Sequence, residues 1–413
     1  MFDFMKNELY YALNKLVEAN VLTQENTIVF FGYNHHARLS ISYLIGAGYS
    51  ADNMRIVDNY ADGNYCGIEV CRPEAILAPW NSQIIVLLAT ARNNEIKKQL
   101  KKLGYRNNQC IVTLNKSSLM YKYGSHLRIK SPNKYNRALN GIGYVWYKKN
   151  HPDICAITEQ NEKFKNIHAG ERCFIMGNGP SIKNIDLSLL KDEYVFGVNQ
   201  VTGIKNWENA NINSWVCIDG DFLGLWTNAN LHFFDELKKI NNPNIEAFVP
   251  VEAKRNIERY QIDKCMKVNY VNFKQQFINL DQKLTIDDID MRKHIMQPYN
   301  VVIACINIAI YMGFSKIYLL GCNQSVLLSE IGEFLNAQTV EMHGIEGEDL
   351  SKSITLERLK SKGMYHEIKT QLTQLAQFRV LAEYAQKKGI EIVNLSSPTL
   401  IESIPQGEFT EVI

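Results

Sequence analysis

Short apolar runs alternate with longer amphipathic stretches over residues 27–115. TIVFFG, NMRIVDNY, SQIIVLLAT and QCIVTL each predict a buried strand, and the segments between them have the spacing of helices. Strands that alternate with helices favour a parallel sheet with right-handed crossovers. We therefore expect a small Rossmann-like α/β domain over residues 1–118.

Residues 119–169 are rich in Lys, Asn and Tyr and predict a linker with helical segments. A second α/β pattern follows, so we expect a doubly wound parallel-sheet domain over residues 170–413. Its strands are predicted at RCFIMG, YVFGVNQ, NSWVCIDG, IEAFVP, KVNYVNF, SKIYLLG and IEIVNLS. Helices are predicted at SIKNIDLSLLKD, at NVVIACINIAIYMG and over the long stretch from Glu367 to Gly389.

Two polar segments interrupt this second pattern. Residues 325–362 indicate a loop-rich region, and residues 274–296 have the composition of a lid over a site. Arg292, Lys293 and His294 within that lid candidate would either close over an anionic sugar or form a solvated run of charges.

Composition and charge narrow the class of protein. Hydrophobic residues make up 46% of the 413 residues and the formal net charge is +2, which gives no support to broad nucleic-acid binding. The nine cysteines form no C-x-x-C pair, which favours reduced thiols in the cytoplasm over disulfides or a zinc ribbon.

The sequence contains no signal for insertion into a membrane. No apolar run reaches about 18 residues, so no transmembrane helix is expected. The first 20 residues are amphipathic and lack the features of a signal peptide. Packing of this helix on its own domain is the favoured role, and peripheral association with the inner face of the membrane stays open, as does a homo-oligomer.

The corner after the first strand leaves two alternatives for the N-terminal domain. Gly32 follows that strand and Asp58 ends the next one, as in domains that hold a dinucleotide. The corner reads G-Y-N-H-H-A, however, with bulky residues where the backbone would have to approach a pyrophosphate. A structural or recognition domain is therefore the favoured alternative, and nucleotide binding is the other.

The corner after the first strand of the second domain reads Gly177-Asn178-Gly179-Pro180-Ser181. The two glycines permit a tight turn and a close approach to a ligand, and proline suits the first position of a helix. Ser181 and the free N–H groups of the helix would face an anion, and Asn178 would face a base or a ribose. The P-loop lysine is missing, so hydrolysis of a nucleoside triphosphate at a P-loop is not expected.

Polar residues also end the neighbouring strands, where doubly wound folds bind their ligands. Each of them could instead cap a helix or turn, but together they predict a polar floor for a nucleotide: Asn199, Gln200, Asp219, Asp221 and Asn323. Gly321, at the same strand end as Asn323, is a further candidate for nucleotide binding. Asp219 and Asp221 also match the acidic pair by which many glycosyltransferases hold a divalent metal, although such a match is frequent by chance.

G-N-G-P-S, FGVNQ, MGFSKIYLLGCN and KKGIEIVNLSSPTLIESIPQ together resemble a family of bacterial sialyltransferases that act on surface glycans. The resemblance covers about residues 170–408, and it extends to the related domain of 6-hydroxymethylpterin diphosphokinase and of motility-associated glycosylation factors. It implies a glycosyltransferase of bacterial surface glycan or polysaccharide synthesis, with a CMP-linked, sialic-acid-like donor and a glycan acceptor.

The resemblance also implies roles for individual residues. Asn178 and Ser181 would contact the ribose and the phosphate, and Asn199 the base or the ribose. Asp219, Asn300 and Asn323 match positions at which the family has an asparagine, a small hydroxyl residue and an acidic residue, and these departures leave the donor undecided.

Transfer of a sugar requires a base that takes the proton of the acceptor hydroxyl, and histidine suits this task near neutral pH. His366 and His343 are the candidates, with His366 favoured, and Tyr365 would serve the phosphate. Displacement would be direct, with inversion, and would require no metal. The alternatives are a pyrophosphokinase-like transferase that uses ATP with Mg²⁺ or Mn²⁺, held by Asp219 and Asp221, and a non-catalytic protein that binds nucleotide sugars.

Overall fold

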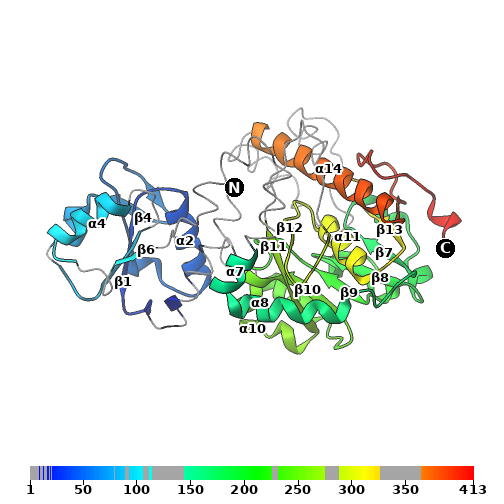
Figure 1. Cartoon of the computed structure of the whole chain (residues 1–413), viewed down its shortest axis with the longest axis horizontal. Helices are drawn as coiled ribbons and strands as arrows, with labels where there is room; N and C mark the ends of the chain where they lie inside the picture. The colour runs from blue at the N-terminus through cyan, green and yellow to red at the C-terminus, as the bar shows by residue number, and fades with distance from the viewer. Residues whose placement is uncertain are drawn as a thin grey trace. The chain divides into compact units, whose positions relative to one another are not determined.

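The computed structural model of the chain (Figure 1) forms two compact units, which we describe separately. One comprises residues 1–125 with 220–230, and the other residues 126–219 with 231–413. The structure describes residues 9, 13, 16, 17, 19, 21–78, 80–88, 93–105, 111–113, 144–225, 231–274, 288–325 and 364–413. Among them, no helix is both long and apolar enough to cross a bilayer.

The N-terminal unit contains a six-stranded sheet of order β3-β4-β2-β1-β5-β6. All neighbouring strands are parallel except β3 and β4, so the predicted Rossmann-like sheet is confirmed. The sequence analysis missed the β3–β4 hairpin, which lies within DNYADGNYCGIEVC. The elements are β1 (Thr27–Phe31), α2 (His35–Gly46), β2 (Met54–Val57), β3 (Asn64–Tyr65), β4 (Ile68–Cys71), α3 (Pro73–Leu77), β5 (Ile84–Leu88), α4 (Asn93–Lys102) and β6 (Ile111–Thr113).

The corner after β1 is held by the carboxylate of Asp58. This carboxylate accepts hydrogen bonds from the backbone N–H groups of Tyr33 (2.8 Å), Tyr60 (2.8 Å) and Ala61 (3.0 Å). The side chain of Tyr33 reaches the segment after β2, where its hydroxyl donates to the carbonyl of Asn64 at 3.1 Å and a Cβ at Gly63 would lie 2.8 Å from its ring. Asp58 therefore joins the corners after β1 and β2, which favours the structural alternative for this unit.

The C-terminal unit contains an eight-stranded, fully parallel sheet of order β12-β11-β10-β9-β8-β7-β13-β14. The predicted doubly wound architecture is thus confirmed. The strands are β7 (Arg172–Met176), β8 (Tyr194–Val198), β9 (Ser214–Val216), β10 (Glu246–Pro250), β11 (Lys267–Lys274), β12 (His294–Met296), β13 (Lys316–Leu320) and β14 (Glu391–Asn394).

The central helix of this unit is α11 (Val301–Met312), which follows β12 and leads to β13. It is apolar on all sides and almost completely buried, as expected of a helix inside a core. The amide of Asn300 caps its first turn, and Gly313 ends it in the left-handed conformation. The predicted buried helix is therefore confirmed.

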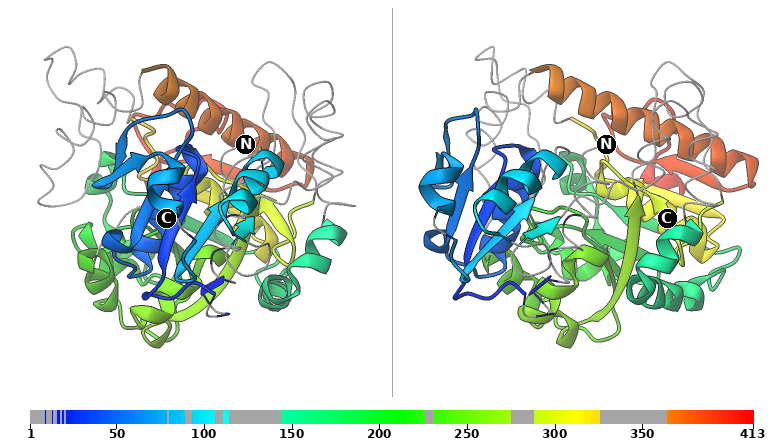
Figure 2. Two further views of the ribbon diagram at one scale, coloured as in Figure 1. Left: turned by 90° about the vertical axis from the view of Figure 1, so that its left-hand side faces the viewer. Right: turned by 60° about the vertical axis from the view of Figure 1, so that its left-hand side comes forward.

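The helix α14 (Met364–Lys387) packs against α11 and runs along one side of the unit (Figure 2). The remaining α-helices are short: α7 (Tyr144–Asn150), α8 (Pro152–Glu159), α9 (Leu231–Lys238) and α10 (Lys254–Arg259).

The prediction of a continuous helix at SIKNIDLSLLKD was wrong. Two 3₁₀ helices, η4 (Pro180–Asn184) and η5 (Leu187–Leu190), take its place. Between them, Asp186 accepts hydrogen bonds from the N–H and hydroxyl of Ser188. Such a local side-chain contact competes with the backbone pattern of a continuous α-helix.

Replacement of Asp58 by Asn is expected to lower the free energy of unfolding by about 1–3 kcal/mol at neutral pH, because backbone donors would face an amide that cannot accept from all three. Burial alone would raise the pKa of Asp58, but the three hydrogen bonds and nearby Arg72 together lower it below 3.8. The contribution of the carboxylate is therefore complete above pH 3.8 and is lost as the pH falls through the folded-state pKa.

Denaturant unfolding of the full chain, from neutral pH to below pH 3.8, measures the difference in unfolding free energy between Asp58→Asn and the unmodified protein. Asp62→Asn is the matched control, because its exposed carboxylate pairs only with Arg72 among the described residues. Equal effects of the two variants, or a difference that does not shrink in acid, would contradict the role of Asp58.

Candidate functional site

The site begins where the connections of the C-terminal sheet change direction. From β7 the chain proceeds through β8 to β12 on one side, and then returns to β13 and β14 on the other side of β7. In doubly wound folds, ligands bind in the crevice that such a reversal leaves between the carboxyl ends of two strands. The corners after β7 and β13 are Gly177–Ser181 and Gly321–Gln324, which contain seven of the twelve predicted nucleotide-binding residues.

The two corners lie backbone against backbone. The N–H of Gly177 donates to the carbonyl of Leu320 at 2.7 Å, and the N–H of Gly179 donates to that of Gly321 at 2.8 Å. A Cβ at Gly177 would lie 2.6 Å from the carbonyl oxygen of Gly321, and one at Gly179 would lie 2.5 Å from it. These glycines are therefore required by the neighbouring corner, whereas the sequence analysis attributed them to the approach of a ligand.

Ser181 and Asn323 are both buried and bind each other. The Oδ1 of Asn323 accepts from the hydroxyl of Ser181 at 2.8 Å and from its N–H at 3.1 Å. The Nδ2 of Asn323 donates to the carbonyl of Pro398 at 2.5 Å. Asn323 thus connects the two corners to the chain segment after β14.

The pairing of Ser181 with Asn323 bears on the prediction that Ser181 and a helix N-terminus face the phosphate. Pro180 begins η4 as predicted, but η4 has five residues and the hydroxyl of Ser181 is already engaged. A short 3₁₀ helix therefore replaces the predicted α-helix N-terminus at this corner, and the hydroxyl of Ser181 donates to Asn323.

Asn178 and Asn199 end the adjacent strands β7 and β8, and each carries a buried amide oxygen. Neither Oδ1 atom has a hydrogen-bond partner among the residues that the structure describes. The backbone of Asn199 is fixed in the left-handed region, since its N–H donates to Val216 at 3.0 Å and its carbonyl accepts from the indole of Trp215 at 2.9 Å. Two positioned amides with unmet hydrogen-bonding capacity therefore lie beside the point of reversal.

A network of amides joins α11 and α14 to the corner after β13. The Oδ1 of Asn300 caps α11, and its Nδ2 donates to Gln324 at 3.1 Å. Gln324, with a positive φ of 56°, donates in turn to Gln371 at 2.8 Å and to Gln374. Sequence reasoning found Asn300 but missed Gln371 and Gln374, although their spacing on one face of the predicted helix was a usable signal.

The acidic pair divides between the two compact units. Asp219 is half-buried in the C-terminal unit, and Asp221 is exposed and belongs to the other unit. Gln200 is half-buried and precedes the short 3₁₀ helix η6 (Val201–Gly203). Within the described ranges, no group of three or more His, Cys, Asp or Glu side chains gathers as a metal site.

The candidate catalytic side chains all lie outside the part of the chain that the structure describes. His343 lies outside the described residues. Tyr365 and His366 belong to the first turn of α14, but their side chains also lie outside the described part of the chain. Their roles therefore stay predictions.

Residues 288–296 of the lid candidate do not lie over the candidate site. Residues 275–287 lie outside the described residues, whereas His294 begins the edge strand β12. Arg292 and Lys293 directly precede this parallel strand, so they lie at the amino end of the sheet. This part of the predicted lid is therefore at the end opposite Gly177–Ser181 and does not close over that corner.

No protein-family model matches the chain, and no curated protein matches it significantly. A solved structure to which the chain is similar is the sialyltransferase CstII from Campylobacter jejuni, a glycosyltransferase, in complex with the substrate analogue cytidine-5'-monophosphate. The identity is 14% and the TM-score 0.32, over 58% of this chain and 85% of that chain. The assignment of the fold rests on the strand order described above.

Replacement of Asn323 by Ala is expected to lower the free energy of unfolding of the C-terminal unit by roughly 2–4 kcal/mol. The change leaves the buried N–H and hydroxyl of Ser181 without their acceptor, at about 1–3 kcal/mol for each buried group, whereas the carbonyl of the exposed Pro398 can bind water instead. Ser181→Ala removes one partner and is expected to cost less. Thermal and denaturant unfolding measure both, and an Asn323→Ala variant as stable as the wild type would contradict the connecting role.

Proposed function

We propose that the C-terminal unit is a glycosyltransferase that binds a nucleotide-activated sugar at the reversal between β7 and β13. The favoured donor is CMP-linked and sialic-acid-like, and the acceptor is a glycan of the bacterial surface. The observation that supports this proposal is the pair of buried amide oxygens of Asn178 and Asn199 at adjacent strand ends.

The chemistry of these two side chains favours the nucleoside part of the donor. An orphaned buried acceptor costs about 1–3 kcal/mol, which a ligand with a suitable donor would recover. Ribose hydroxyls and the amino group of cytosine are donors, whereas a phosphate offers only acceptors at neutral pH. In the proposed complex, Asn178 and Asn199 therefore contact the ribose and the base.

The proposed reaction is direct displacement at the anomeric carbon with inversion. A general base removes the proton of the acceptor hydroxyl as the new bond forms, and the nucleoside monophosphate leaves with the bonding electrons. His366, or alternatively His343, is the proposed base, and Tyr365 is proposed to donate a hydrogen bond to the leaving phosphate.

CMP is expected to stabilise the C-terminal unit without added metal. A ligand at 100 times its dissociation constant adds about 2.7 kcal/mol, equivalent to a rise in Tm of roughly 5–10 °C for a unit of this size. Thermal unfolding with CMP, CDP, UDP, GDP and ATP, each with and without Mg²⁺ or Mn²⁺, measures the response. A response to ATP with metal only would support the pyrophosphokinase-like alternative and reject this proposal.

Asn178→Ala and Asn199→Ala are each expected to weaken CMP binding about 3- to 10-fold, because each removes one neutral hydrogen bond to the ligand. Asn178→Ala should not lower the stability of the free protein, since the orphaned oxygen is removed as well. Asn199→Ala is expected to lower it by about 1 kcal/mol, because alanine is strained at the positive φ of 44°. Asn209→Ala is the matched control, because Asn209 is exposed in η7 (Trp207–Ala210), which leads to the amino end of β9.

Isothermal titration with CMP measures the affinities of the three variants. Wild-type affinity in both Asn178→Ala and Asn199→Ala, together with CMP binding by the unmodified protein, would place the nucleotide elsewhere. No binding of any nucleotide to the unmodified protein would reject the proposal.

A further inference from the structure

A cavity of about 920 Å³ lies at the amino end of the C-terminal sheet, opposite the reversal point. Its volume is within the range of pockets that hold small ligands. The lining comes from the ends of α11 and α14 and from the segments that precede β12, β13 and β14. The length of α11, about 18 Å at 1.5 Å per residue, separates the cavity from the capping residue Asn300.

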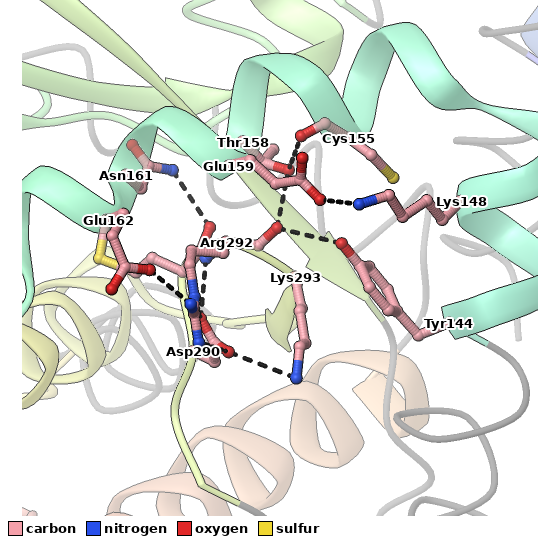
Figure 3. A network of polar contacts seen from close by, with 11 residues as sticks. Tyr144, Lys148, Cys155, Thr158, Glu159, Asn161, Glu162, Asp290, Arg292 and Lys293 are labelled. Carbon is pink, nitrogen blue, oxygen red and sulfur yellow. Dashed lines mark hydrogen bonds and ion pairs between the residues drawn. The ribbon is translucent and has the colours of Figure 1, made fainter.

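One wall of the cavity is held firmly by the neighbouring helices (Figure 3). The carbonyl of Arg292 accepts from the hydroxyl of Thr158 at 3.0 Å and from that of Tyr144 at 3.3 Å. Asn161 donates to the carbonyl of Met291 at 3.1 Å. The wall is thus fixed before any ligand arrives, which reduces the entropic cost of binding.

The acidic groups of the lining are already occupied. Asp290 accepts from the guanidinium of Arg292 at 2.8 and 2.9 Å, and the ammonium of Lys293 lies 3.4 Å from its carboxylate. Asp288 accepts from Lys388 at 2.9 Å and from Tyr384 at 3.2 Å. Each carboxylate of the lining is therefore already paired with a cation.

The donors, in contrast, are in excess. An ammonium group has three hydrogens, and among the described residues Lys293 and Lys388 each contact a single carboxylate. Lys165, which also lines the cavity, has no ion pair in the described part of the chain. A cavity with surplus cationic donors fits a ligand that carries a carboxylate or a phosphate.

Tyr311 provides a further donor. It lines the cavity with 4% of its surface exposed, and its hydroxyl has no hydrogen-bond partner among the described residues. Burial raises the pKa of Tyr311 to about 12, so the hydroxyl keeps its proton near neutral pH. The half-buried Tyr384 adds apolar surface against which the face of a sugar ring can pack.

We propose that this cavity binds a small acidic saccharide, a sugar of one or two residues with a carboxylate or a phosphate group. Lys293 and Lys388 contact the anionic group, and Tyr311 donates to a ligand oxygen. The site is separate from the proposed nucleotide site and does not depend on it.

Isothermal titration of the full chain, with no nucleotide present, tests the proposal with four probes: glucuronate, glucose 6-phosphate, glucose and inorganic phosphate. Glucuronate or glucose 6-phosphate is expected to bind, and to bind at least about tenfold more tightly than glucose, because a hydrogen bond to a charged group exceeds a neutral one. The proposal is overturned if neither acidic sugar binds, if glucose binds equally well, or if inorganic phosphate alone matches glucose 6-phosphate.

Variants then locate the bound sugar. Lys293→Gln and Tyr311→Phe are expected to weaken binding about three- to tenfold, and Tyr311→Phe is expected to raise the Tm of the free protein, since it removes an unpaired buried hydroxyl. Lys316→Gln is the matched control, because Lys316 begins β13 at the same end of the sheet without lining the cavity. Wild-type affinity in both test variants, or an equal loss in the control, would overturn the site.

Discussion

The contact between the corners after β7 and β13 is the constraint on which the candidate site depends. Two parallel strands that are neighbours in the sheet but far apart in sequence end in turns whose backbones touch, and Gly177, Gly179 and Gly321 leave no room for a side chain there. Because the backbones meet so closely, the Asn323 amide can reach Ser181 and satisfy its buried groups. The same contact fixes the strand end that carries Asn178.

The fold was largely predictable because its signals are local. Strands buried on both faces appear as continuous apolar runs, and α11 appears as a helix that is apolar all round with Asn300 and Gly313 at its ends. The failure at SIKNIDLSLLKD has a local cause as well, since Asp186 binds the N–H of Ser188, a backbone donor that a continuous helix would use. Helical spacing alone does not reveal that competition.

The site was predictable only in part, because its function depends on partners that are distant in sequence. The sequence placed Ser181 and Asn323 at strand ends, but it could not show that the two residues pair across 142 positions. Asn178 and Asn199 have the same residue type and a similar location, yet their buried oxygens find no such partner among the described residues. The difference between a structural amide and a candidate binding amide therefore lies in the tertiary packing.

The two proposed sites share the helices α11 and α14 as supports. Asn300 and the glutamines of α14 meet Gln324 near the reversal point, whereas Tyr311 and Lys388, near the other ends of these helices, line the cavity. A buried helix that packs on all sides cannot shift without disturbing its whole core. Since α11 is such a helix, it holds both sites in fixed positions, so a ligand at either end meets a preformed surface and not one that must first assemble.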